Sequence, residues 1–162
     1  MAQLFEAARM GSNMYDIAKH SGDYFKSGFN CSESVLSAVA DHYGIESELI
    51  PRIATGLGAG MGKSSGVCGA LSGGILALNM LFGRDAVDQA DAKTQTYKKV
   101  NPLVRTLKEK FGTTLCTDLL GFNLGEEGAD ERFDAEGMFD KVCKPVTEAA
   151  AQMVVDIAGD KE

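Results

Sequence analysis

The sequence predicts an all-α protein, a single-domain bundle of about six to seven helices with a buried glycine-rich central helix, spanning residues 1–162. Apolar residues recur at intervals of three and four along most of the chain, as they do on one face of an α-helix. Stretches with the alternating pattern of a β-strand are nearly absent. The segment 64–83 carries no charge and several glycines, which favours a helix packed closely among others.

The first two helices are predicted from their apolar faces and their end signals. The first places Met14, Ile17, Ala18, Ser21, Tyr24 and Phe25 on one face. It ends near Gly28. The second begins with Asn30 as N-cap, because Glu33 stands three residues later as a capping box requires, and it ends at Gly44.

A short third helix is expected over 47–55, followed by a glycine-rich connector over 56–62. The uncharged helix then begins near Ser65. Its length alone would suit a membrane span, but its small and polar residues favour a buried helix in a soluble core. A protein that does not span a membrane is therefore predicted.

The second half of the chain is predicted to be helical as well. A long helical segment contains Tyr97, Val100, Val104, Leu107 and Phe111 on one face. Pro102 is expected to kink or restart that helix. A short helix follows Thr114, and a final helix begins near Pro145, since proline is favoured at the first helical position.

Composition limits the classes of function. A net charge of −7 and a pI near 4.9 argue against nucleic acid and against an anionic membrane as partners. The first residues lack the basic and apolar regions of a signal peptide. We therefore expect a cytoplasmic protein, in which four cysteines serve metal binding or redox chemistry rather than permanent disulfides. A homodimer is compatible with so apolar and glycine-rich a chain.

Each of the four cysteines stands where a helix is predicted to begin. Cys31 follows Asn30, Cys68 lies three residues after Ser65, Cys116 lies two after Thr114, and Cys143 precedes Lys144 and Pro145. Unpaired N–H groups and the positive end of the helix dipole lower a thiol pKa and stabilise a bound anionic cluster. The four cysteines are therefore the predicted redox-active and metal-binding set.

The spacing of the cysteines excludes local motifs. The intervals of 37, 48 and 27 residues contain no CxxC, so zinc ribbons, thioredoxin-like sites and bacterial ferredoxin sites are ruled out. Any shared site must be assembled by folding. The alternative is that the cysteines are small buried hydrophobic residues with no common role.

Small residues surround Cys68 in the predicted helix. Gly66, Gly69, Gly73 and Ala77, together with Ala70, fall on one stripe. Without side chains there, either a second backbone or a cofactor can approach closely. Close helix packing and cofactor binding at Gly66, Gly69 and Gly73 are both predicted, and they are compatible.

The block from Gly66 to Gly73, with one cysteine before it and two after it, resembles a family described as redox-active and labelled by the pattern C…GCAxxG…C…C. The resemblance covers about residues 25–158. It implies that Cys31, Cys68, Cys116 and Cys143 are the functional set. The layout is also similar to the cysteine-bearing part of the split-Soret cytochromes, which implies an iron–sulfur cluster. Haem does not carry over, because the chain has no CxxCH.

Two further segments resemble known binding motifs but lack residues that those motifs require. The Gly-Lys-Ser sequence ending at Ser64 resembles the end of a P-loop, but Leu57 stands where the first glycine is required, so no nucleotide is expected. The acidic stretch 126–140 is interpreted as a solvated loop, with partner docking as a minor alternative. Arg132 and Ala135 occupy positions where a calcium loop needs a ligand and a glycine.

Three functions remain open from the sequence. The favoured one is electron transfer to an unidentified redox protein partner by an iron–sulfur cluster on the four cysteines. The first alternative is thiol–disulfide redox chemistry without metal, and the second is a structural zinc site or interaction module. Ligation by His42 is a further option, although surface roles are favoured for His20 and His42.

Overall fold

The computed structural model describes residues 16–159, and these residues form helices and no β-strand, which confirms the predicted fold class. In chain order the elements are α2 (Ile17–Lys26), α3 (Cys31–Tyr43), the 3-10 helix η1 (Arg52–Leu57), α4 (Gly58–Lys63), α5 (Gly69–Phe82), α6 (Ala90–Phe111), α7 (Cys116–Leu120), α8 (Ala129–Ala135), the π-helix η2 (Phe139–Cys143) and α9 (Lys144–Ala158). Met14, expected on the first helix, lies outside the described residues.

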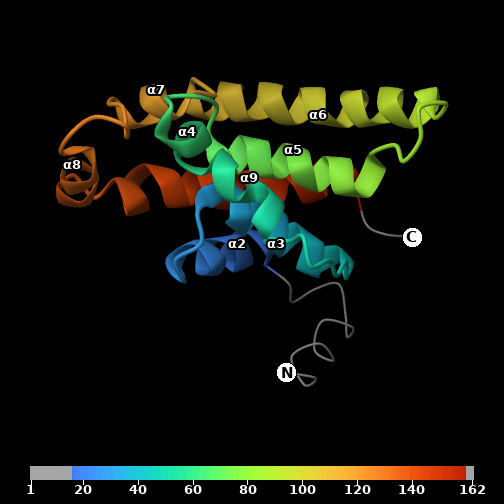
Figure 1. Ribbon diagram of the computed structural model, residues 1–162, viewed down its shortest axis with the longest axis horizontal. Coiled ribbons are helices and arrows are strands. Elements are labelled where there is room, and N and C mark those ends of the chain that lie inside the picture. The colour runs from blue at the N-terminus through green and yellow to red at the C-terminus, as the bar shows by residue number, and fades with distance from the viewer. Residues whose placement is uncertain (1–15, 160–162) are drawn as a thin grey trace, which may run out of the picture.

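The glycine-rich helix α5 lies at the centre, as predicted. It packs against α3, α6 and α9, while α2 covers α3 and α9 on the far side from α6 (Figure 1). A Cβ added at Gly73 would lie 2.8 Å from the Cα of Ser32 in α3, so the two backbones touch. Gly74 makes room in the same way for Leu103 of α6 and Val154 of α9. Because glycine has no side chain, Gly73 and Gly74 allow α3, α6 and α9 to pack closely against α5.

Several predicted helix ends are confirmed. Asn30 and Glu33 form the complete capping box at the start of α3, and Gly44 ends the helix with a left-handed backbone at φ 65°. A short helix, α7, follows Thr114, and α9 carries Pro145 in its first turn. Local sequence signals were sufficient at the ends of α3 because both of its caps are satisfied within five residues.

The uncharged helix does not begin near Ser65. Ser65 has φ 63°, a left-handed conformation that cannot open an α-helix, and Cys68 is the N-cap of α5. Gly66 consequently lies before the helix and not on its glycine stripe. The expected helix over 47–55 is also displaced, since the regular element there is a 3-10 helix at Arg52–Leu57.

Two expectations for the second half are wrong. Helix α6 does not restart at Pro102 but continues through it from Ala90, because its packing on α5 and α9 offsets the one hydrogen bond that proline removes; the alternative, a kink at Pro102, stays a prediction. The acidic stretch 126–140 is not a continuous loop. It contains α8 and the start of η2, whose apolar residues Phe133 and Met138 pack against a small hydrophobic cluster.

No helix within residues 16–159 is long and apolar enough to cross a bilayer. The buried residues form two hydrophobic clusters. The larger, which we call the main core, is built from α3, α5, α6 and α9. The smaller, which we call the end cluster, has Cys116, Leu120, Phe122 and Ala129 at its centre.

Candidate functional site

All four cysteines line one cavity of about 310 Å³, and each comes from a different element. Cys31 is the first residue of α3, Cys68 is the N-cap of α5, Cys116 is the first residue of α7 and Cys143 is the last residue of η2. Four side chains separated in the sequence by 27 to 48 residues therefore line the same cavity, while a shared function for them stays a prediction. The rest of the wall is apolar and includes Phe25, Phe29, Phe133 and Phe139.

Polar contacts behind Cys31 attach the next segment of chain to the start of α3. The amide of Asn30 donates to the carbonyl of Thr55 at 2.9 Å, and the hydroxyl of Ser32 donates to the carbonyl of Ala54 at 2.7 Å. The hydroxyl of Thr55 also donates to the Glu33 carboxylate. Because the capping residues hold η1, the chain that follows it must pass directly beside Cys31.

That following segment, α4, is a left-handed turn. Ala59, Gly60, Met61 and Gly62 all have φ between 53° and 69°. Alanine and methionine in this conformation cost roughly 1–2 kcal/mol each, and such strain concentrates at functional sites. The turn touches two cysteines. The backbone N–H of Ala59 bonds to the sulfur of Cys31, and a Cβ on Gly60 would lie 2.7 Å from the Cβ of Cys116.

A two-residue antiparallel bridge joins the chain around Cys68 to the chain around Cys116. Val67 and Leu115 are the bridged pair. The N–H of Cys68 donates to the carbonyl of Thr114 at 2.8 Å, and the N–H of Cys116 donates to the carbonyl of Gly66 at 3.0 Å. Two segments that are 48 residues apart in the sequence are thereby fixed side by side.

The small residues around Cys68 have a packing explanation at three positions. A Cβ on Gly69 would overlap with the sulfur of Cys31 and would lie 3.1 Å from the Leu57 carbonyl oxygen. Gly73 accommodates the α3 backbone, and Gly66 lies under the side chain of Met61. These glycines thus allow other atoms of the protein to come close. Contact between a cofactor and Gly66, Gly69 or Gly73 stays a prediction.

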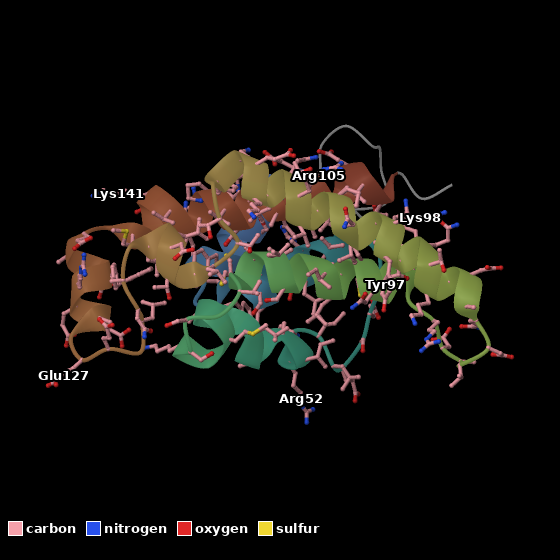
Figure 2. All side chains as sticks on the ribbon, turned by 90° about the horizontal axis from the view of Figure 1, so that it is seen from above. Arg52, Tyr97, Lys98, Arg105, Glu127 and Lys141 are labelled. Carbon is pink, nitrogen blue, oxygen red and sulfur yellow. The ribbon has the colours of Figure 1, made fainter. Side chains whose placement is uncertain are left out.

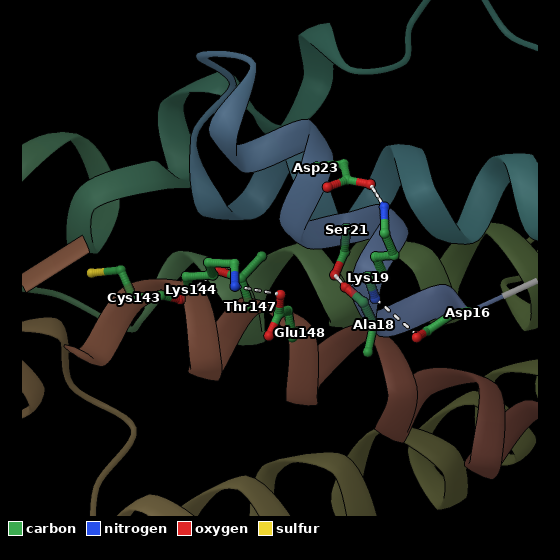
Figure 3. A network of polar contacts seen from close by, with 9 residues as sticks. All are labelled: Asp16, Ala18, Lys19, Ser21, Asp23, Cys143, Lys144, Thr147 and Glu148. Atoms are coloured by element: carbon green, nitrogen blue, oxygen red, sulfur yellow. Dashed lines mark hydrogen bonds and ion pairs between the residues drawn. The ribbon is translucent and has the colours of Figure 1, made fainter. Parts of the chain in front are cut away.

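Cys143 is the N-cap of α9, as predicted, but the chain that precedes it is already helical. Residues 138–158 are helical without a break, and the N–H of Lys144 donates to the Phe139 carbonyl within the π-helical turn. The carbonyl of Cys143 accepts from the Thr147 hydroxyl at 2.8 Å. Figure 3 shows the Cys143 sulfur directed away from the neighbouring Lys144–Glu148 ion pair, which measures 3.1 Å. The prediction of unpaired N–H groups at Cys143 was wrong, because proline can follow a π-helical turn.

The predicted lowering of the thiol pKa values is also wrong. Burial raises the pKa of all four cysteines, that of Cys68 to about 12 and that of Cys116 to about 11. Backbone N–H groups act in the predicted direction, from Ala59 and Ala70 on Cys31 and from Ala70 on Cys68, but desolvation of a thiolate in an apolar cavity outweighs them. The neighbouring sulfurs raise the pKa of Cys68, Cys116 and Cys143 further.

The side chains that line the cavity do not converge on one ion. Within residues 16–159, no group of three or more His, Cys, Asp and Glu side chains is arranged to hold a metal ion. His20 and His42 are absent from the cavity wall. The Nε2 atom of His20 lies 2.9 Å from the Asp41 carboxylate, and His20 lies in the first half of α2.

Sequence reasoning missed two parts of the site. The four phenylalanines of the wall are scattered between 25 and 139 and share no spacing that could reveal them. The left-handed turn had one usable signal, since Gly56, Gly58, Gly60 and Gly62 alternate. Glycine at every second position suits a chain that needs positive φ, but Ala59 and Met61 adopt it as well.

The fold and the cavity define a helical protein with four thiols gathered in one apolar pocket. The sequence profile of the family described as "Putative redox-active protein (C_GCAxxG_C_C)" matches residues 29–157. The chain belongs to this family, which confirms the predicted resemblance, and the matched region contains all four cysteines. Comparison with curated proteins and with solved structures gives no match.

Proposed function

We propose that this protein transfers electrons through an iron–sulfur cluster held by Cys31, Cys68, Cys116 and Cys143. One observation carries the proposal: thiols from four separate elements line a single apolar cavity. Four cysteine thiolates are the ligand set of [2Fe–2S] and [4Fe–4S] clusters. When bound, such a cluster supplies one-electron transfer between redox partners.

The arrangement of the thiols favours a cluster over a single zinc ion. Structural zinc needs four ligands that converge on one point at about 2.3 Å from each sulfur. Within the described residues no three candidate ligands are placed in that way. A cluster divides its ligands among several iron atoms, so its cysteines need to surround a cavity but need not converge.

Besides the four cysteines, residues of the chain have two tasks in this proposal. The backbone N–H groups of Ala59 and Ala70 hydrogen-bond to cysteine sulfur and favour its charged form. Hydrogen bonds to cluster sulfurs and exclusion of solvent both influence the reduction potential. The aromatic wall, which includes Phe25 and Phe139 with stacked rings at 4.5 Å, limits the access of water.

Thiol–disulfide chemistry without metal is the second candidate. The charge of one sulfur raises the pKa of another, which indicates that these thiols are neighbours. Neighbouring thiols favour this second candidate. Against it, exchange requires a thiolate nucleophile, and burial keeps these thiols protonated at neutral pH. Both candidates suit a reducing compartment such as the cytoplasm, which stays a prediction along with the homodimer and the separate redox partner.

Anaerobic purification followed by iron and sulfide analysis tests the proposal. We expect a brown protein with iron and acid-labile sulfide in cluster stoichiometry and with visible absorbance that bleaches on reduction. Cys68→Ser should remove the colour and leave far-ultraviolet circular dichroism largely intact. Met153→Leu, a sulfur-removing change in the main core outside the cavity wall, should leave both unchanged.

Three results would contradict the cluster. Zinc in equimolar amount without visible absorbance would identify a structural ion. A metal-free protein from an iron-replete anaerobic preparation, with cysteine pairs that oxidise reversibly to disulfides by mass spectrometry, would identify thiol–disulfide chemistry. A metal-free protein whose thiols stay unpaired would leave the cysteines as core residues.

A further inference from the structure

We propose that electrons leave and enter through the α4–α7 face, defined by the side chains of Met61 and Leu115, and that its partner is a one-electron carrier protein with a positively charged docking surface. The inference rests on the proposed function, since it concerns the partner of the four-cysteine site. In each exchange one electron moves from the reduced site to the oxidised centre of the partner, and no proton transfer is required.

The α4–α7 face lies directly over two of the cysteines. Leu115 immediately precedes Cys116, and Met61 belongs to the left-handed turn that packs on the same residue. The Met61 side chain covers Gly66, whose carbonyl accepts the Cys116 N–H at 3.0 Å. Successive residues of an extended segment point to opposite sides, so Leu115 faces outward while Cys116 faces the cavity. One layer of protein therefore separates a molecule on this face from a thiol.

The two apolar side chains at the centre of the face are exposed, while the cysteine next to them is buried. Met61 is 42% exposed and Leu115 is 41% exposed, whereas Cys116 beneath them is 9% exposed. Met61 also holds a strained backbone, with φ 61°, which keeps its side chain on the surface. Two apolar residues suit a small, short-lived contact of the kind that redox partners make.

The rim of this face is acidic. Five exposed carboxylates belong to α7, to the following loop and to α8, namely Asp118, Glu126, Glu127, Asp130 and Glu131. The loop touches α4, since a Cβ on Gly125 would lie 2.6 Å from the Lys63 carbonyl oxygen. The ammonium of Lys63 already donates to Asp130 at 2.7 Å. Arg132 of α8 pairs with Glu136, and Lys108 and Lys110 end α6 nearby, so five carboxylates face three lysines and a basic partner is attracted.

Three other exposed apolar residues, Tyr97, Val87 and Phe29, lack the combination of a position next to a cysteine and an acidic rim. Tyr97 lies far along α6 among basic residues such as Lys98, away from the end that carries Glu127 (Figure 2). Val87 is in the segment between α5 and α6 and does not line the cavity. Phe29 does line the cavity, but its ring packs on Tyr24 and charges of both signs stand close by in the chain, at Asp23 and Lys26.

Stopped-flow oxidation of the reduced holoprotein tests the face. The probes are ferricytochrome c, a basic one-electron acceptor, and ferricyanide, an anionic one. For the unmodified protein, the rate with ferricytochrome c should fall about tenfold between low and high ionic strength, and the rate with ferricyanide should rise. Leu115→Lys should slow the reaction with ferricytochrome c about fivefold and speed up the reaction with ferricyanide. Leu115→Glu should have the opposite effect on each probe.

Val87→Lys is the matched control, because it adds the same charge at a residue that is 87% exposed and distant from the cavity wall. It should leave both rates within twofold of the parent. Iron content and circular dichroism check that each variant is folded and loaded. Equal effects of Leu115→Lys and Val87→Lys, or a rate with ferricytochrome c that rises with salt, would overturn the docking face alone. A protein without a reducible centre would overturn the proposed function and this inference together.

Discussion

The main core and the end cluster each supply half of the candidate site. Cys68 belongs to the main core and Cys31 packs against it, whereas Cys116 belongs to the end cluster and Cys143 packs against that. The cavity lies where the two clusters meet, and Val142 contacts both. A four-thiol site of this kind exists only while the two clusters are docked.

The two halves of the site differ in how many buried side chains surround their cysteines and in the N–H groups near the sulfurs. The main core has many fully buried side chains, among them Leu36, Leu78 and Leu103, while the end cluster has four buried residues at its centre. Burial raises the pKa of all four thiols, but backbone N–H groups oppose this at Cys31 and Cys68 and not at Cys116 and Cys143. The main core is therefore a fixed platform, and docking of the end cluster completes the site.

The largest effect should come from a cavity in the main core. Leu78→Ala should lower the free energy of unfolding by about 3–4 kcal/mol, because the residue is fully buried in a core that cannot collapse around the gap. Leu120→Ala in the end cluster should cost about 2 kcal/mol, since a small cluster relaxes more easily. Urea unfolding of the metal-free protein measures both.

Amide hydrogen exchange of these two variants tests whether the end cluster opens independently of the main core. Leu120→Ala should speed up amide exchange in α7 and α8 and leave α3 and α5 protected, since local opening needs less free energy than global unfolding. Equal acceleration throughout the chain would show that the two clusters unfold as one unit.

Gly69→Ala should have a smaller but more specific effect, at the contact between α5 and Cys31. The added methyl group would overlap with the Cys31 sulfur and crowd the Leu57 carbonyl, so we expect a loss of about 2 kcal/mol and a reduced iron content after anaerobic loading. Gly56→Ala is the control, since a Cβ there meets open space and its φ is ordinary. Similar losses for both variants would argue against the predicted clash.

The stability of the metal-free, reduced protein should fall as pH rises above about 9. The folded pKa of Cys68 is about 12 and that of Cys116 about 11, against 9.0 for an ordinary thiol, so between these limits the folded protein binds more protons than the unfolded chain. Thermal unfolding under reductant should give a declining Tm from pH 9 to 11 and a plateau below pH 8. Cys68→Ala should flatten the decline. Tyr24→Phe should flatten it slightly, because Tyr24 also has a raised pKa of about 12. A Tm independent of pH across this range would contradict the buried thiols.

The smallest effect is expected from polar contacts at the surface, the first of them where α2 meets α3. Tyr24→Phe removes the hydroxyl that donates to Asp41 at 2.7 Å and should cost about 0.5–1 kcal/mol, since the contact is partly exposed. Tyr97→Phe on the surface of α6 should change stability by less than about 0.5 kcal/mol. Chemical denaturation separates the two, and equal changes would mean that the Asp41 contact contributes nothing.

The sequence by itself determined the helical fold class, the capping box of α3 and the four residues of the candidate site. These features depend on periodicity and on contacts within a few residues, which a sequence displays directly. It led to wrong expectations at Ser65, Pro102 and 126–140, where packing between distant segments overrides local preference.

Only the tertiary structure decided how the four sulfurs are surrounded. The bridge between Val67 and Leu115, the left-handed turn beside Cys31 and the scattered phenylalanines come from segments that are remote in the chain. Burial in this cavity raises the pKa values of the thiols, whereas the sequence had predicted that they would be lowered. At a helix start, nearby N–H groups stabilise a thiolate. The free energy needed to remove that thiolate from water is larger than the stabilisation that these groups provide.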